Sequence, residues 1–129
     1  MSNIDLTPTF LDIADAKAGR IMDGQSLLPF AQNPGKAPKR ALPIEATGKL
    51  FVAEGFPQDY DRPYSGVRTD RYKYVKWSYG EIELYDLKKD PYELKNLASS
   101  PSYAAIVKQL EAERARLAKC RGAACNAEK

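Results

Sequence analysis

Four prolines fall between residues 19 and 43, and this stretch most constrains what the chain can fold into. They are Pro29, Pro34, Pro38 and Pro43, with Gly35 among them. Proline fixes one backbone dihedral and donates no backbone hydrogen bond, so it interrupts helix interiors and central strands. Long irregular loops are also uncommon inside compact domains. We therefore predict that residues 19–43 wrap over a surface or connect two parts of the protein.

The segments on either side of this stretch have different periodicities. Before it, residues 3–16 predict a helix, because Thr7 can cap it and Pro8 suits its first position. After it, strands are predicted wherever the residues alternate and aromatic or β-branched side chains gather. These segments are residues 41–47, 64–70, 71–78 and 81–87. A fifth segment, residues 49–55, either pairs with the first or continues the sheet.

A last helix is expected near the C-terminus. Ser100 can cap it, Pro101 suits its first turn, and apolar residues then recur at helical spacing as far as Leu117. Glu111 and Arg114 are spaced to pair across one turn. The predicted fold is α+β, with a small antiparallel sheet of about four strands and the C-terminal helix packed on one face. We divide the chain into residues 1–40, the N-terminal helix and Pro-rich connecting segment, and residues 41–129, the α+β domain.

Composition narrows the chemistry that the chain can perform. Of its 129 residues none is histidine, which removes the commonest general acid/base and a common metal ligand. The net charge of +3 is too small to suggest nucleic acid as a partner. No apolar run is long enough to span a membrane, and the N-terminus has no signal-peptide pattern, so we expect no membrane association.

Residues 83–98, ELYDLKKDPYELKNLA, gather carboxylates as a metal or acid/base site would. A calcium loop would need a central glycine and oxygen ligands at alternating positions, which this segment lacks. Asp90 and Glu93 have the spacing of a capping box, in which each side chain accepts the other's backbone N–H. We therefore interpret Asp90 and Glu93 as structural caps and predict no catalytic and no metal-binding residue in the chain.

The densest basic stretch is residues 62–76, and it includes Arg68, Arg71 and Lys73. One interpretation is a solvated strand face. The other is a surface that faces an anionic ligand.

Cys120 and Cys125 are the two cysteines, and four residues separate them. Such a pair alone does not complete a zinc site, which usually needs four ligands. A disulfide in an exported protein and two free thiols in a loose tail are the alternatives.

The sequence as a whole resembles the C-terminal portion of arylsulfatase-type sulfatases of the alkaline-phosphatase-like superfamily. Three strings carry this resemblance in the expected order: NIDLTPTFLDIADA followed by MDGQSLLPF, then YSGVRTDRYKYVKW, then ELYDLKKDPYELKNLA. The match runs from about Asn3 to Leu117. Asp15 departs from it, because a glycine is common at this position.

The resemblance implies a chain without the catalytic head of such an enzyme. Sulfatases convert a cysteine or serine in a C/S-x-P-x-R motif to formylglycine, but neither Cys120 nor Ser99 begins such a motif here. The resemblance thus places calcium and formylglycine in the missing catalytic domain. We predict that this chain itself binds no cofactor. The chain alone is predicted to be inactive. The resemblance is compatible with a parent enzyme that is exported, either to the periplasm or out of the cell.

The resemblance also implies a partner for this chain, namely the catalytic domain of the parent sulfatase. The chain would buttress that domain, and Arg68, Arg71, Lys73 or the loop 55–64 would shape one wall of the cleft for a sulfated substrate. Without that catalytic domain, the N-terminal helix would dock on its own sheet or form a homo-oligomer with another copy of the chain. The alternative function is a stand-alone binding module for sulfated glycans or other anionic ligands.

Overall fold

The computed structural model describes residues 2–36, 39–46 and 62–126, which belong to two compact units. Unit 1 combines the two ends of the chain, Met1–Ala41 and Arg116–Lys129, and unit 2 is Leu42–Ala115. In the part of the chain that the structure describes, no helix is long and apolar enough to cross a bilayer.

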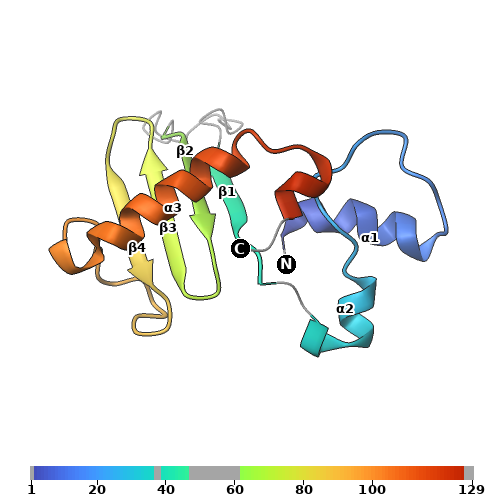
Figure 1. Ribbon diagram of the computed structural model, residues 1–129, viewed down its shortest axis with the longest axis horizontal. Helices are drawn as coiled ribbons and strands as arrows, with labels where there is room; N and C mark the ends of the chain where they lie inside the picture. The colour runs from blue at the N-terminus through green and yellow to red at the C-terminus, as the bar shows by residue number, and fades with distance from the viewer. Residues whose placement is uncertain (1, 37–38, 47–61, 127–129) are drawn as a thin grey trace, which may run out of the picture. The chain divides into compact units, whose positions relative to one another are not determined.

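Unit 2 is built on a four-stranded antiparallel sheet whose strands lie side by side in chain order (Figure 1). They are β1 (Leu42–Ala46), β2 (Tyr64–Arg68), β3 (Tyr72–Trp77) and β4 (Ile82–Asp86). All four predicted strands are confirmed, and residues 49–55 lie outside the described residues. A tight turn joins β3 to β4, in which Gly80 has a φ of +98° and donates its N–H to the carbonyl of Trp77.

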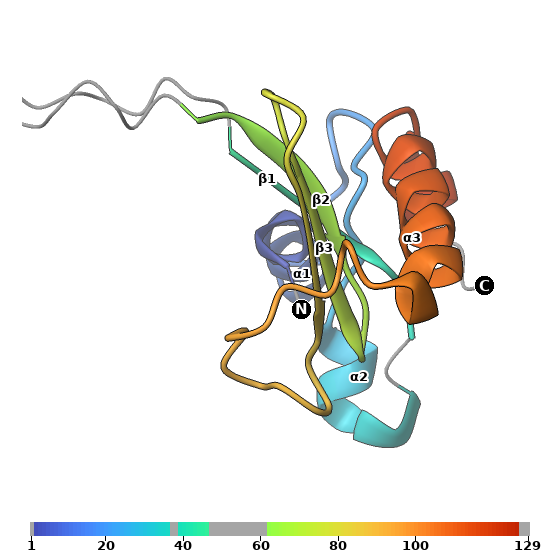
Figure 2. The same cartoon turned by 90° about the vertical axis from the view of Figure 1, so that its left-hand side faces the viewer.

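Helix α3 (Ala104–Leu117) follows a short 3₁₀ turn, η4 (Pro101–Tyr103), and lies along one face of the sheet (Figure 2). The face that it covers includes Tyr74, whose hydroxyl donates to Glu111 of α3. Three side chains of this unit are completely buried in its apolar interior: Val67, Tyr74 and Leu84. The predicted α+β arrangement is confirmed, and the alternation in β3 turns Tyr74 and Lys76 toward the helix.

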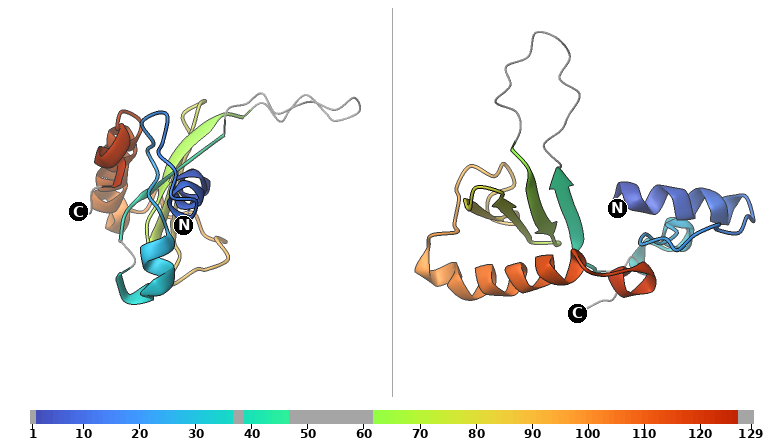
Figure 3. Two further views of the ribbon diagram at one scale, coloured as in Figure 1. Left: turned by 90° about the vertical axis from the view of Figure 1, so that its right-hand side faces the viewer. Right: turned by 90° about the horizontal axis from the view of Figure 1, so that it is seen from above.

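Unit 1 contains short helices from both ends of the chain (Figure 3). The N-terminal part holds η1 (Asn3–Asp5), α1 (Leu6–Ile13), α2 (Leu28–Gln32) and η2 (Pro34–Lys36), and the C-terminal part holds η5 (Gly122–Asn126). The predicted helix therefore ends at Ile13, and Asp15 takes a positive φ of +49°. The Pro-rich stretch contains α2, where Pro29 stands in the first turn and no internal hydrogen bond is lost.

A buried ionic cluster joins the segments of unit 1. The Asp5 carboxylate is completely buried and accepts hydrogen bonds from the N–H groups of Ser2 and Gln25 and from the guanidinium of Arg40. Arg40 also donates to the side chain of Asn126, near the opposite end of the chain. Burial alone would raise the pKa of Asp5, but the hydrogen bonds from Arg40, Ser2 and Gln25 lower that pKa below its ordinary value.

Candidate functional site

The structure brings two of the three predicted cleft residues together on one face of the sheet. Arg68 in β2 and Lys73 in β3 are directly opposite each other in the register. Their neighbours Val67 and Tyr74 point toward α3, so Arg68 and Lys73 lie on the face that α3 does not cover. Arg68 is exposed, and no described residue forms an ion pair with it.

Arg71, the third of these residues, is occupied by a carboxylate of the next strand. Its Nε lies 3.2 Å from both oxygens of Asp86, and its Nη2 lies 2.9 Å from Oδ2. Asp86 is completely buried, whereas 44% of the Arg71 side chain is exposed. The hydrogen bonds from Arg71 lower the pKa of Asp86, which is therefore a structural counter-ion and no proton donor at neutral pH.

Lys73 is also occupied, because its Nζ donates to the Glu93 carboxylate at 2.5 Å. The predicted capping box is thus absent, and this is a correction to the interpretation of Asp90 and Glu93. The Asp90 carboxylate accepts the N–H of Lys95 at 2.8 Å, while Glu93 has a φ of +57° and its N–H reaches the Asp90 carbonyl. Asp90 still organises a turn, but no helix follows it.

The reason for this difference is a long-range pairing that competes with helix formation. The Asn96 side chain accepts the N–H of Leu84 and donates to the carbonyl of Ile82, both in β4. The N–H of Leu97 then donates to the Leu84 carbonyl at 2.8 Å. Residues 96–97 therefore satisfy backbone groups of Ile82 and Leu84 at the free edge of β4.

Glu111 is the centre of a charged cluster that the sequence revealed only in part. It accepts hydrogen bonds from Tyr74 (2.9 Å), Lys76 (3.1 Å) and Arg114 (2.7 and 2.9 Å). The predicted pair between Glu111 and Arg114 is confirmed. These hydrogen bonds, led by that of Arg114, lower the pKa of Glu111 to about 2, and burial together with Glu111 raises the pKa of Tyr74.

A groove of about 600 Å³ lies beside this cluster within unit 2. Its lining combines aromatic, hydroxyl and charged side chains, namely Glu45, Ala46, Pro63, Tyr64, Ser65, Lys76, Trp77, Ser78 and Arg114. Trp77 stacks against Tyr79 and meets Tyr64 edge to face. An aromatic wall next to cations suits a polar ring that carries an anionic group. Residues 55–61 of the predicted cleft loop lie outside the described residues.

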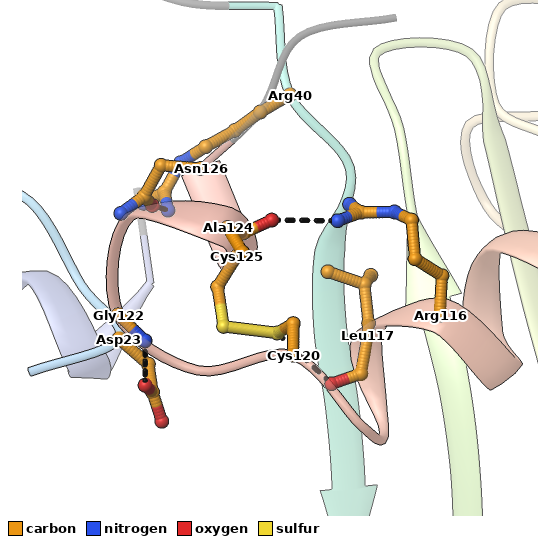
Figure 4. Close-up of a disulfide and its surroundings, with 9 residues drawn as sticks. All are labelled: Asp23, Arg40, Arg116, Leu117, Cys120, Gly122, Ala124, Cys125 and Asn126. Carbon is orange, nitrogen blue, oxygen red and sulfur yellow. Dashed lines mark hydrogen bonds between the residues drawn. A yellow bond between two sulfur atoms is a disulfide. The ribbon is translucent and has the colours of Figure 1, made fainter.

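The two cysteines lie in unit 1, where a disulfide joins Cys120 to Cys125 (Figure 4). We call residues 117–126 the C-terminal hook. The disulfide closes its loop, and the N–H of Gly122 in this loop donates to Asp23 at 2.6 Å. In the ranges that the structure describes, no three potential metal ligands gather at one point.

Comparison with known proteins shows the family to which the chain belongs. Residues 1–120 match the model of the family described as "N-sulphoglucosamine sulphohydrolase, C-terminal". Two relatives come from Bacteroides thetaiotaomicron: an N-acetylglucosamine-6-O-sulfatase, 31% identical over 84% of this chain, and a Δ4,5-hexuronate-2-O-sulfatase, 36% identical over 81% of it. This chain covers 19% and 21% of their lengths, so it spans about a fifth of each relative.

The similarity also holds for three-dimensional structure. The structure of BT4656 in complex with its substrate D-glucosamine-2-N,6-O-disulfate superposes with a TM-score of 0.73 and 30% sequence identity. The superposition covers 89% of this chain and 23% of that one.

Proposed function

Because the chain belongs to the N-sulphoglucosamine sulphohydrolase C-terminal family, we propose that it buttresses the catalytic domain of a sulfatase and hydrolyses no sulfate ester by itself. The observation that carries this proposal is an exposed apolar stripe on α1. Leu6, Phe10 and Ile13 are 43%, 64% and 63% exposed and recur at helical spacing. A stripe of this kind normally packs against another element, and four-fifths of each relative lies outside the region that this chain matches.

The proposed lack of activity rests on the state of the acids in the described residues. Asp5, Asp86 and Glu111 have lowered pKa values and are each paired with an arginine. A general acid requires a pKa close to the working pH, so these carboxylates are unsuited to proton transfer at neutral pH. The chain also has no histidine to take this role.

For the substrate cleft, we propose that Arg68 contributes a cation to the wall. Its guanidinium has no carboxylate partner among the described residues, whereas Arg71 and Lys73 are occupied by Asp86 and Glu93. A free guanidinium is well suited to a sulfate ester because it offers paired donors in one plane.

The absence of activity is tested with the purified full chain and 4-nitrophenyl sulfate. We expect no release of nitrophenol above the buffer rate, with and without added calcium. Turnover that increases in proportion to chain concentration, and that survives repeated purification, would overturn the proposal that the chain supports catalysis without performing it.

The docking stripe is tested by the fluorescence of 8-anilinonaphthalene-1-sulfonate, which increases on exposed apolar surface. We expect the wild-type chain to enhance the fluorescence and Phe10→Ser to remove most of this enhancement. Leu94→Ser is the matched control, because Leu94 is 84% exposed but lies outside α1. Light scattering over a concentration series distinguishes the occupants: a dimer that Phe10→Ser abolishes would indicate a second copy, and not a catalytic domain, on the stripe.

The stand-alone binding module has weaker support. Of the three basic residues that suggested it, only Arg68 lacks a carboxylate partner in the described part of the chain. One free guanidinium gives little of the multivalent contact on which sulfated glycans depend.

A further inference from the structure

We propose that a cavity within unit 1 binds a tetrahedral oxyanion, either inorganic sulfate or a sulfate ester. The cavity has a volume of about 480 Å³. Residues from η1 and α1, from the segment that precedes α2, and from the C-terminal hook line it: Ile4, Thr7, Pro8, Arg20, Ile21, Met22, Asp23, Gly24 and Arg121. This inference does not depend on the docking role proposed above, because none of the stripe residues Leu6, Phe10 and Ile13 lines the cavity.

Two arginines supply the positive charge of this cavity. Arg20 and Arg121 both line it, both are exposed, and neither forms an ion pair or hydrogen bond with a described residue. Arg40, Arg71 and Arg114 are in contrast all paired with carboxylates. Two unpaired guanidinium groups on one cavity favour an anion with several acceptor oxygens, since each group presents parallel N–H donors. The hydroxyl of Thr7 adds a further donor to the lining.

One carboxylate opposes this charge, but it is already engaged. Asp23 lines the cavity, and its Oδ1 accepts the N–H of Gly122 at 2.6 Å. The lining therefore carries two positive charges and one negative charge. Asp23 contributes to the site by fixing the hook beside the cavity, as Figure 4 shows for Asp23 and Gly122.

The hook fixes the backbone of Arg121 from both sides. Cys120, the residue before it, is bonded to Cys125, and Gly122, the residue after it, is held by Asp23. Gly122 has a φ of +61°, and a Cβ at this position would lie 3.0 Å from a methyl group of Ile21, so another residue is disfavoured there. Such preorganisation lowers the entropy that the protein loses when it binds a ligand.

A second part of the cavity wall, at Gly24, also requires a glycine. A Cβ on Gly24 would lie 1.9 Å from the carbonyl oxygen of Ile4, so only glycine allows these two backbone segments to approach so closely. The match to the family model ends at residue 120, so Arg121 and the following residues of the hook lie beyond it. The cavity thus combines a wall from the matched region with a cation from outside it.

The experiment is a titration of the ¹⁵N-labelled full chain with sodium sulfate, at an ionic strength kept constant with sodium chloride. We expect saturable shifts of the amide signals of Thr7, Gly24 and Gly122. Arg20→Gln and Arg121→Gln should each weaken sulfate binding by about ten-fold, because each removes charged hydrogen bonds. Lys17→Gln, which removes an exposed charge of the same unit outside the cavity lining, should leave the affinity within two-fold.

Further arms separate the possible ligands and the part played by the hook. Glucosamine 6-sulfate that binds more tightly than inorganic sulfate would assign the site to an ester, and the reverse would assign it to the free ion. Cys120→Ser/Cys125→Ser should weaken binding if the hook positions Arg121, and unchanged affinity would overturn that role. The proposal fails if no saturable shift occurs, if acetate binds as tightly as sulfate, or if Lys17→Gln weakens binding as much as the arginine variants.

Discussion

In unit 2 the side chains that fill the interior are mainly apolar, whereas in unit 1 the largest completely buried side chain among the described residues is the Asp5 carboxylate. Unit 2 buries Val67, Tyr74 and Leu84 between its sheet and α3. Unit 1 instead joins its segments by the ion pair of Asp5 with Arg40 and by hydrogen bonds of Arg40 to Asn126 and of Gly122 to Asp23. Unit 1 also exposes the stripe on α1, so a share of its apolar surface stabilises nothing within the described part of this chain.

The largest expected effect concerns the apolar interior of unit 2. Leu84 is completely buried in β4, so Leu84→Ala leaves a cavity and should lower the free energy of unfolding by about 4 kcal/mol. Urea unfolding followed by circular dichroism measures this loss. Leu94→Ala, at a position that is 84% exposed, should change it by less than about 0.5 kcal/mol. Equal losses in the two variants would contradict the assignment of the core.

The second effect concerns the ionic interior of unit 1. Asp5→Asn leaves the buried guanidinium of Arg40 without its counter-ion and should cost about 3 kcal/mol. Hydrogen exchange should show faster exchange in unit 1 and little change in β2 to β4. Asp70→Asn, an exposed position, serves as the control. Uniformly faster exchange in both units would show that they unfold together and would remove the contrast between them.

The disulfide should contribute less than the ion pair. Cys120→Ser/Cys125→Ser releases a loop of about six residues, whose closure entropy corresponds to about 2 kcal/mol. Dithiothreitol should lower the urea midpoint of the wild-type chain to that of the double variant. It should leave the midpoint of the double variant unchanged. A wild-type midpoint that does not respond to the reductant would show that the disulfide stabilises little.

A smaller effect is expected from the Glu111 cluster, and it depends on pH. The pKa of Glu111 is about 2 in the folded chain and 4.5 ordinarily, so the unfolded chain binds more protons between these values. The stabilisation is complete above pH 4.5 and is lost as the pH falls toward 2. Because 34% of the side chain is exposed, solvent screening reduces the contribution to about 1 kcal/mol. Glu111→Gln should flatten the stability profile in this window, and an unchanged slope would contradict the assigned pKa.

The smallest effect distinguishes the basic residues of the sheet. Arg68→Ala should make the chain elute from a heparin column at a slightly lower salt concentration, because it removes an unpaired charge. Arg71→Ala should shift the elution less, since Asp86 already neutralises that guanidinium. If Arg68→Ala instead abolishes retention, the stand-alone binding module becomes the better account of the chain.

Local patterns in the sequence predicted most of unit 2. The alternation in residues 71–78 was enough to place one face of β3 against a helix, and the spacing of Glu111 and Arg114 was enough to predict their pairing. Both signals arise from neighbouring residues and follow directly from the geometry of strands and helices. The capping box failed for the opposite reason, because Asn96 and Leu97 bond to a strand more than ten positions away.

The candidate site was less predictable because its chemistry depends on distant pairs. The sequence identified Arg68, Arg71 and Lys73 as cations but did not show that Asp86 and Glu93 occupy two of them. It also gave no sign that Arg40 lies between Asp5 and Asn126, which are 35 and 86 positions away from it. Such pairs follow from the fold, and no periodicity in the sequence encodes them.

The chain-order arrangement of β1 to β4 has a consequence for the time course of folding. Each strand pairs only with its neighbours in sequence, so the sheet can form from local hairpins soon after residue 86 is available. Unit 1 joins Asp5 to Arg40 and Arg40 to Asn126, so it can close only after residue 126 has been synthesised. During translation on the ribosome, the helices of residues 3–13 should thus reach their final structure later than the sheet that follows them in sequence.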